Sequence, residues 1–197
     1  MMQQDVSPLQ KVIDVVTKNG IIIFPTDTAF GIGCRIDSKE AVKRLFSIKK
    51  RDAKQAVPVL VDSIAMAKKY VDEIPLEVEE KLLKKYWPGA LTVVLPCKKD
   101  RVNSLVRGGN NTLALRQPDN KAILQIISAV GLPLIGTSAN FHGEKTPYEF
   151  TDLNPTLVGL VDYVLIGSTF AKNASTIVDC SEKPWKIIRQ GAVQVQL

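Results

Sequence analysis

The stretch PTDTAFGIGC, Pro25–Cys34, follows directly after the apolar run Ile21–Phe24. The run has the composition of a buried strand, and the stretch after it predicts a turn that contains two threonines, one aspartate and two glycines. Threonine hydroxyls can donate and accept hydrogen bonds, and glycine lets the backbone come close to a ligand. The end of this strand is therefore a candidate ligand site. A turn whose hydroxyls bond only their own backbone is the alternative.

Helix-like and strand-like segments alternate on both sides of that stretch. The helical pattern covers Leu9–Lys18, Lys39–Ile48, Ser63–Val71, Leu76–Tyr86, Lys121–Val130 and Pro155–Leu160. The strand-like runs are Ile21–Phe24, Val57–Val61, Leu91–Leu95, Thr112–Arg116, Leu134–Gly136, Tyr163–Ile166, Thr176–Val178 and Lys186–Arg189. Some strands are separated by helices, whereas others follow one another closely. We therefore expect an α/β fold with one twisted, mixed sheet flanked by helices.

The composition is that of a globular protein: 45% of the 197 residues are hydrophobic and 23% are charged. Neither a repeat nor a linker interrupts the sequence, so we expect one domain over residues 1–197. The N-terminal MMQQDVSPLQ has no signal-peptide pattern, and each apolar run is too short to span a bilayer. The three cysteines are far apart and form neither a CxxC motif nor an even disulfide framework. These features predict a cytoplasmic protein without a membrane partner or a metal centre of its own.

Basic residues outnumber acidic ones, and the formal net charge is +6. A positive surface suits a nucleic acid or a polyanion such as ATP, although solvated lysines on helix surfaces explain much of the same excess. The segment IKKRD, Ile48–Asp52, places Lys49, Lys50 and Arg51 at the end of a predicted helix. Cations here can complement the helix dipole, or they can bind phosphates if they converge on one anion.

Arg116 ends the otherwise apolar strand in TLALRQPD, Thr112–Asp119. An arginine that closes a buried strand needs an anionic partner, because an unpaired buried charge costs several kcal/mol. A ligand carboxylate or phosphate is one candidate partner. Asp119, three residues further on, is the alternative, and it would make Arg116 a structural residue.

The densest group of small polar residues lies in PLIGTSANFHGEKTP, Pro133–Pro147. Backbone N–H groups of a glycine-containing loop, together with serine and asparagine side chains, can line a phosphate. The loop contains His142, the only histidine, which we leave out of the site because a lone loop histidine is more often exposed than catalytic. Weaker polar signals follow in STIVD, Ser175–Asp179, and IIRQGA, Ile188–Ala192.

Several common catalytic motifs are missing from the sequence. It contains no GxxxxGK[ST] loop, no GxGxxG after the first strand, no HExxH and no GxSxG. The sequence therefore gives no support to a P-loop ATPase, a dehydrogenase, a zinc protease or a serine hydrolase.

Taken in order, these segments resemble the YrdC-like family of threonylcarbamoyl-AMP synthases. The family pattern runs PTDTxYGLG, IKxR, PGPxT, a strand ending in R-x-P, SAN-x-SG, STxVD and R-x-G, and the resemblance covers nearly the whole chain. It implies the YrdC-like α/β fold with a concave, positively charged cavity, in the short, single-domain form of the family. It also implies synthesis of threonylcarbamoyl-AMP from L-threonine, bicarbonate and ATP for threonylcarbamoyladenosine in tRNA, with a downstream threonylcarbamoyl transferase as partner.

The same resemblance assigns residues to two halves of a site. Threonine would be held by Thr28, Arg116, Ser175 and backbone near Gly136. ATP would be held by Lys49, Arg51, Thr112, Ser138, Asn140, Thr146 and Arg189, with Lys49 and Arg51 in the catalytic role. Magnesium would arrive with ATP and keep most of its water and phosphate ligands.

The chain departs from the family pattern at several positions. Gln55, Ala56, Val57 and Leu60 stand where members often carry Lys-Pro-Leu and then His, and this removes two polar contacts. Phe30 replaces a common tyrosine, Ala90 a proline, His142 a serine and Ser168 a glycine.

Two other functions fit parts of the pattern. The related domain of hydrogenase maturation proteins performs carbamoyl transfer, but its usual acylphosphatase-like and zinc-finger neighbours are absent from this sequence. A non-catalytic RNA-binding module would explain the positive charge. Aromatic residues make up only 6% of the chain, which provides few platforms for base stacking.

Overall fold

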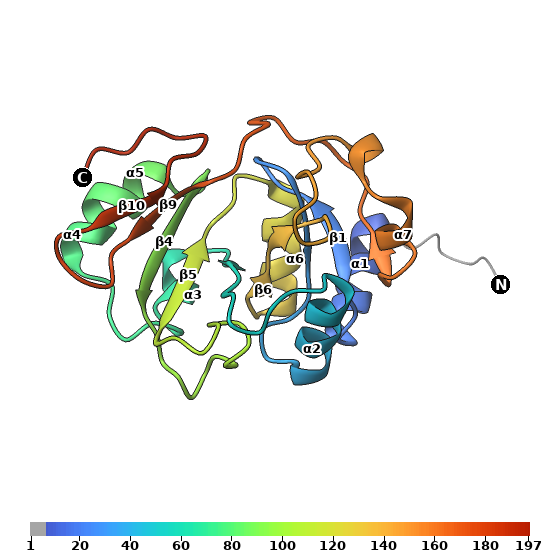
Figure 1. Ribbon diagram of the computed structural model, residues 1–197, viewed down its shortest axis with the longest axis horizontal. Helices are drawn as coiled ribbons and strands as arrows, with labels where there is room; N and C mark the ends of the chain where they lie inside the picture. The colour runs from blue at the N-terminus through green and yellow to red at the C-terminus, as the bar shows by residue number, and fades with distance from the viewer. Residues whose placement is uncertain (1–6) are drawn as a thin grey trace.

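The computed structural model describes residues 7–197, which form helices and strands in alternation (Figure 1). The predicted absence of a signal peptide rests partly on residues 1–6, which lie outside this range. The helical elements are α1 (Pro8–Thr17), α2 (Lys39–Ile48), α3 (Ile64–Ala67), α4 (Leu76–Val78), the π-helical turn η1 (Glu79–Leu83), α5 (Lys84–Tyr86), α6 (Lys121–Val130), the 3-10 turn η2 (Phe150–Asp152) and α7 (Pro155–Val158). The strands are β1 (Ile22–Pro25), β2 (Phe30–Gly33), β3 (Val59–Leu60), β4 (Leu91–Pro96), β5 (Thr112–Arg116), β6 (Leu134–Ile135), β7 (Thr137–Ser138), β8 (Tyr163–Val164), β9 (Thr176–Asp179) and β10 (Lys186–Arg189).

The strands divide between two mixed sheets, where the sequence predicted one. The smaller sheet has the order β7-β2-β1-β8, and the larger has the order β10-β9-β4-β5-β3-β6. Each sheet contains parallel and antiparallel pairs, so the predicted mixed pairing is confirmed. In Figure 1, β10, β9, β4 and β5 stand on one side of the molecule, and β1 with α1, α2 and α7 on the other.

Two predicted helices and two predicted strands have the same bounds in the structure: α2, α6, β5 and β10. The predicted helix Ser63–Val71 is reduced to Ile64–Ala67, and Pro155–Leu160 is reduced to Pro155–Val158. Sequence patterns missed β2, because it contains Gly31 and Gly33, and β7, because it has only two residues.

The two sheets meet where β2 ends against β6. Gly33 lies so close to Ile135 that a Cβ at Gly33 would stand 1.7 Å from the Ile135 carbonyl oxygen. The Ile135 N–H donates to the Cys34 carbonyl at 2.9 Å, and Arg35 forms an isolated bridge with Leu134. Glycine at position 33 therefore allows the backbones of the two sheets to touch.

Local signals fix the ends of the three longest helices. Ser7, Ser38 and Asn120 each accept a hydrogen bond from a backbone N–H in the first turn of α1, α2 and α6. Gly131 ends α6 with φ of 72°, in the left-handed region that glycine adopts without strain. These caps explain why the predicted bounds of α2 and α6 agree with the structure.

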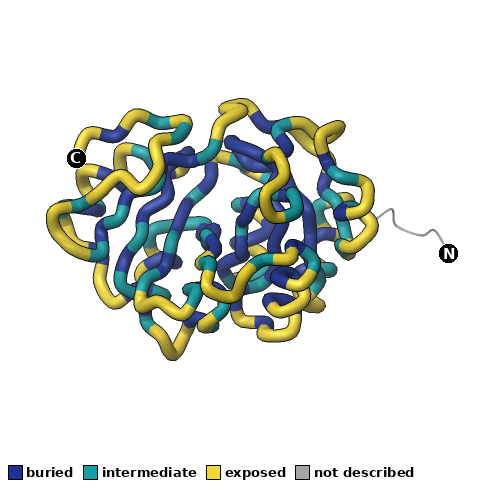
Figure 2. The backbone as a smooth tube through the Cα atoms, viewed as in Figure 1, coloured by how far each residue is buried: buried dark blue, intermediate teal, exposed yellow. Residues whose placement is uncertain are grey.

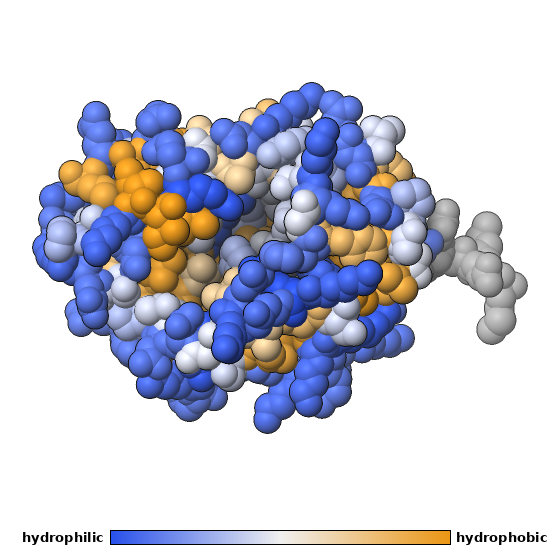
Figure 3. Space-filling view, viewed as in Figure 1, coloured by the Kyte–Doolittle hydropathy of each residue, from blue (hydrophilic) through white to orange (hydrophobic). Residues whose placement is uncertain are grey.

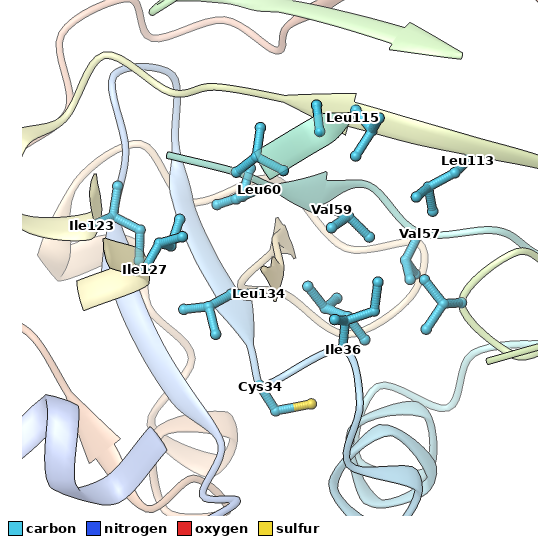
Figure 4. Packing of buried hydrophobic residues seen from close by; sticks show 14 of the residues in the cluster. Cys34, Ile36, Val57, Val59, Leu60, Leu113, Leu115, Ile123, Ile127 and Leu134 are labelled. Carbon is cyan, nitrogen blue, oxygen red and sulfur yellow. The ribbon is translucent and has the colours of Figure 1, made fainter. Parts of the chain in front are cut away.

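Apolar side chains from both sheets join one connected core (Figure 4). Leu60, Leu115, Ile127 and Leu134 are among its members, and the longest strands and the inner faces of the helices are buried (Figure 2). Among residues 7–197, helices are all too short or too polar to cross a bilayer. The core thus holds the ends of β1, β5 and β7, where the candidate residues lie, in fixed relative positions.

Candidate functional site

Arg116 ends β5 and is buried, with 8% of its side chain exposed. Its Nη2 donates to Asp27 Oδ1 at 2.5 Å, its Nη1 to the Thr28 hydroxyl at 2.7 Å and its Nε to the Gly89 carbonyl at 2.9 Å. Burial lowers the pKa of Arg116, and the Asp27 carboxylate opposes that shift. Because Asp27 and Thr28 follow β1, these bonds join the ends of strands from two different sheets.

The anionic partner of Arg116 in the protein is therefore Asp27, and the alternative that named Asp119 is wrong. Asp119 is exposed, and no ion pair involves it within residues 7–197. Asp27 lies inside the stretch PTDT, so the sequence contained the residue, but pairing over 89 positions leaves no local signal. Arg116 selects its partner through the packing of the two sheets.

Lys49 stands just after α2 and is almost completely buried, with 2% exposure. Its Nζ donates to the carbonyl oxygens of Ser138 at 2.5 Å and Asn140 at 2.6 Å, and its own carbonyl accepts from the His142 N–H. Burial lowers the pKa of Lys49 to about 7; the charge of Arg51 adds to this shift, and that of Glu144 opposes it. Lys49 thus links the end of α2 to the Pro133–Pro147 loop through three hydrogen bonds.

The same loop fixes its polar side chains through internal bonds. The Ser138 hydroxyl donates to Asn140 Oδ1 at 2.6 Å, and Asn140 Nδ2 donates to the Glu144 carbonyl at 2.6 Å. Ser138 lies opposite Gly31 in the β2–β7 pair, which places it near the PTDT turn. Lys49, Ser138 and Asn140, predicted on separate segments, are therefore in direct contact.

Ser175, directly before β9, and Arg189, the last residue of β10, form a third group. Arg189 donates twice to the Ser175 carbonyl, at 3.0 and 2.8 Å, and the hydroxyls of Ser175 and Thr92 are 2.9 Å apart. The charge of Arg189 contributes to lowering the pKa of Arg116, so the two arginines lie near each other. This group therefore belongs to the same larger sheet as Arg116.

The other predicted residues lie around these groups. Gly136 faces Leu60, whose strand pairs with the end of β5 at Arg116. The Arg51 guanidinium donates to the carbonyl oxygens of Gln55 and Ala56, and Thr146 precedes Pro147, whose carbonyl accepts from the Phe30 N–H. Thr112 shares a face of β5 with Arg116 but begins that strand, about 13 Å away along it. A ligand that touches both must extend along β5.

Figure 3 shows the surface hollowed between the two sides of the molecule that Figure 1 displays. Arginine, hydroxyl and amide groups stand at the strand ends described above, and groups of these kinds can bind anions. In the described part of the chain, clusters of His, Cys, Asp and Glu suitable for a metal ion are absent. The arrangement can therefore hold anionic groups.

Comparisons with known proteins show which proteins this chain is similar to. Threonylcarbamoyl-AMP synthase of Bacillus subtilis is 32% identical over 91% of this chain and 52% of the relative. The synthase of the same name from Vibrio cholerae is 33% identical over 94% of this chain and 98% of the relative. The crystal structure of Sua5 from Pyrococcus abyssi, complexed with L-threonine, has a TM-score of 0.86 at 29% identity, over 93% of this chain and 54% of that one.

The chain spans about half the length of the Bacillus and Pyrococcus relatives and nearly all of the Vibrio one. The likeness to solved structures confirms the predicted YrdC-like fold. A family model named Sua5_yciO_yrdC, with the description "Telomere recombination", matches residues 14–191. Because that match covers most of the chain, the protein belongs to the Sua5/YciO/YrdC family.

Proposed function

We propose that this protein is a nucleotidyltransferase that makes L-threonylcarbamoyl-AMP and pyrophosphate from L-threonine, bicarbonate and ATP. The observation that carries the proposal is the buried Arg116, which bonds Asp27 and Thr28 across the two sheets, while Lys49 bonds carbonyls of the Pro133–Pro147 loop. Relatives named threonylcarbamoyl-AMP synthase at 32 and 33% identity support the reaction.

The threonine half of the proposed site consists of Arg116 and the residues around it. Arginine is suited to a carboxylate because its planar fork provides two parallel N–H donors. Thr28, Ser175 and backbone near Gly136 complete this half. The fold likeness to a protein solved with L-threonine supports an amino acid as a ligand.

The ATP half comprises Lys49, Arg51, Thr112, Ser138, Asn140, Thr146 and Arg189. Phosphates are stabilised by cations and by hydroxyl, amide and backbone N–H donors, which these residues supply. Lys49 and Arg51 take the catalytic role, because they place positive charge where charge develops on the phosphates. Magnesium enters as part of the substrate, Mg·ATP, and retains water and phosphate ligands.

In the proposed mechanism, the free amine of threonine adds to bicarbonate-derived CO2 and loses a proton, which gives a carbamate. A carbamate oxygen then attacks the α-phosphorus of ATP, and pyrophosphate leaves. The protein contributes position and charge stabilisation, since the two reacting anions repel each other. This division of labour agrees with a site that is rich in Lys, Arg, Ser, Thr and Asn.

The experiment that tests the function measures pyrophosphate release from purified protein with ATP and Mg²⁺, omitting threonine or bicarbonate in turn. Release is expected only when both are present, together with an adenylate product that contains the carbons of both. Release that does not depend on threonine would overturn the proposal.

RNA binding is a second candidate function. A groove of about 550 Å³ lies between the start of α2 and the loop 98–107. It is lined by Ile36, Asp37, Lys39, Lys43, Lys99, Asp100, Arg101, Val102, Asn103, Ser104, Leu105 and Arg107. Within residues 7–197, Lys39, Lys43 and Lys99 form no ion pair, and Asp37 is already bound by Arg35. Unpaired cations that face one another across a groove favour a polyanion.

The proposal extends to the surroundings of the enzyme. Its product would be passed to a transferase that adds threonylcarbamoyl to tRNA, and the proposed location is the cytoplasm. Support for a reducing compartment comes from Cys34, Cys97 and Cys180, which are free and buried.

A further inference from the structure

Asp27 has one carboxylate oxygen in use and one without a partner. Oδ1 accepts from Arg116, whereas Oδ2 has no hydrogen bond to any residue of 7–197, although only 5% of the side chain is exposed. In the same part of the chain, every fully buried polar side-chain atom has a hydrogen-bond partner. Oδ2 is therefore not completely buried, and it keeps some surface on which it can accept a hydrogen bond.

The Thr28 hydroxyl is also an acceptor toward a ligand. The Thr26 hydroxyl donates to the Ala29 carbonyl at 2.7 Å, accepts from the N–H groups of Thr28 and Ala29, and lies 3.0 Å from the Thr28 hydroxyl. Thr28 accepts from Arg116 Nη1. A hydroxyl oxygen has two lone pairs, so Thr28 can accept a second hydrogen bond from a ligand group that donates.

Arg116 retains donors of the opposite kind. A guanidinium has five N–H groups, of which Gly89, Thr28 and Asp27 take one each, on Nε, Nη1 and Nη2. One hydrogen therefore remains on each terminal nitrogen. Each of these hydrogens can donate to a carboxylate oxygen. Two hydrogen-bond acceptors, Asp27 Oδ2 and the Thr28 hydroxyl oxygen, thus lie next to the remaining donors of Arg116.

We propose that Asp27 binds the α-ammonium group of the amino-acid substrate through Oδ2, with Thr28 as second acceptor, while Arg116 binds the carboxylate. The inference rests on the proposed function and deepens it, because it makes Asp27 a substrate-binding residue that selects α-amino acids over their α-hydroxy analogues. The competing explanation is that Asp27 only positions Arg116.

The two explanations differ for ligands that lack one charged group. The experiment measures binding by calorimetry for L-threonine, L-threoninamide, which lacks the carboxylate, and the matching 2,3-dihydroxybutanoate, which lacks the amine. The proteins are wild type, Asp27→Asn and the control Asp119→Asn, which removes a nearby exposed carboxylate. Asparagine keeps an oxygen for Arg116 and replaces Oδ2 with a donor.

We expect Asp27→Asn to lower the affinity for L-threonine and for L-threoninamide about ten- to a hundredfold, which is the range for a lost charge-assisted contact. The affinity for dihydroxybutanoate should stay within about twofold of the wild-type value. Asp119→Asn is expected to leave the affinities for all three ligands unchanged. If the affinities for L-threonine and dihydroxybutanoate fall equally while that for L-threoninamide is unaffected, Asp27 only positions Arg116, and the inference is overturned.

The wild type alone provides a second test that does not depend on the folding of Asp27→Asn. It is expected to bind L-threonine at least about tenfold more tightly than dihydroxybutanoate. Equal affinities would overturn the inference and leave the proposed function standing. Failure of the wild type to bind L-threonine at all, with ATP present or absent, would instead overturn the proposed function.

Discussion

At the scale of single residues, the two cations that dominate the site are held in different ways. Arg116 is paired with a buried carboxylate, whereas Lys49 is buried against backbone carbonyls of the Pro133–Pro147 loop. Pairing keeps a guanidinium charged, while burial without a carboxylate disfavours an ammonium charge. Their responses to mutation and to pH therefore differ.

Arg116→Lys should raise the apparent KM for threonine about tenfold or more and leave that for ATP within about twofold. Lysine keeps a positive charge beside Asp27, so the large penalty of an unpaired buried carboxylate is avoided, but it lacks the fork for a second carboxylate. Steady-state kinetics checks this after circular dichroism has shown that the variant is folded. Normal threonine dependence in a folded variant would mean that Arg116 does not bind the substrate.

Arg51→Ala should have the opposite effect, with a loss of about ten- to a hundredfold in apparent ATP affinity and little change for threonine. The Arg51 guanidinium donates to the carbonyl oxygens of Gln55 and Ala56, and its charge helps to lower the pKa of Lys49, so we assign it to the phosphate side of the proposed site. Nucleotide binding by calorimetry is the measurement. A parallel loss of threonine affinity would contradict the division into two halves.

Lys49 should give ATP binding a pH dependence. Its pKa is lowered to about 7, so ATP affinity is expected to fall as pH rises through that value, because the ammonium loses its charge. Between about 7 and 10.5 the unfolded chain still holds the proton that the folded chain has released, so this lysine's contribution to the free energy of unfolding rises with pH.

Calorimetric titrations across the pH range check the binding part of this prediction. Lys49→Met should lose the inflection near 7, whereas Lys50→Met, at the exposed neighbouring lysine, should keep it. Retention of the inflection in Lys49→Met would assign it to another group.

At the scale of elements, the contact between the ends of β2 and β6 decides how the sheets meet. Sequence patterns identified the ladder strands β4, β5 and β9, because their alternating apolar residues pack on one side of the larger sheet. They did not identify β2, because glycine is unfavourable in strands. Gly31 packs beneath the Phe24 ring, and Gly33 beneath the Ile135 carbonyl, so tertiary contact overrides this preference.

Gly33→Ala is expected to lower the free energy of unfolding by about 3 kcal/mol or more, because the new Cβ meets backbone that cannot move aside. Gly159→Ala, at the end of α7, is the matched control. Its φ is −69° and its nearest neighbours are 3.6 Å from the added Cβ, so a gain of about 0.4–1 kcal/mol is expected. Urea denaturation measures both. Equal stabilities would contradict the close approach of the sheets.

At the scale of the whole molecule, positive charge gathers in the groove between α2 and the loop 98–107. Thr112, which the proposal assigns to ATP, begins β5 after the connection that contains this loop. The single connected core supports the prediction of one domain over 1–197, which stays a prediction.

Affinity for a tRNA transcript should fall about 10³-fold or more between about 50 and 200 mM salt if several phosphates are contacted. Lys39→Ser with Lys43→Ser should reduce the slope of log affinity against log salt by about 2. Lys11→Ser with Lys18→Ser, at exposed positions in and directly after α1, changes the net charge equally and should leave the slope unchanged. Equal slopes in the two double variants would place RNA elsewhere or exclude specific binding in the groove.

The sequence by itself determined the α/β class, the caps of the long helices and the segments that carry polar side chains. These are local properties, because periodicity, capping and turn chemistry depend on residues a few positions apart. The family resemblance, which rests on the order of short motifs, was also available from the sequence and is confirmed by the match to residues 14–191.

Only the tertiary structure decided that the strands form two sheets, that Arg116 pairs with Asp27, and that Lys49 is buried in the carbonyls of a loop 89 and 91 positions away. Each depends on which distant backbones come together. Asp119 is close to Arg116 in sequence and Asp27 is far from it, yet the fold brings the residues after β1 to the end of β5 and reverses this order in space. Partner choice for a buried charge is set by that packing, because desolvation makes the nearest available carboxylate decisive.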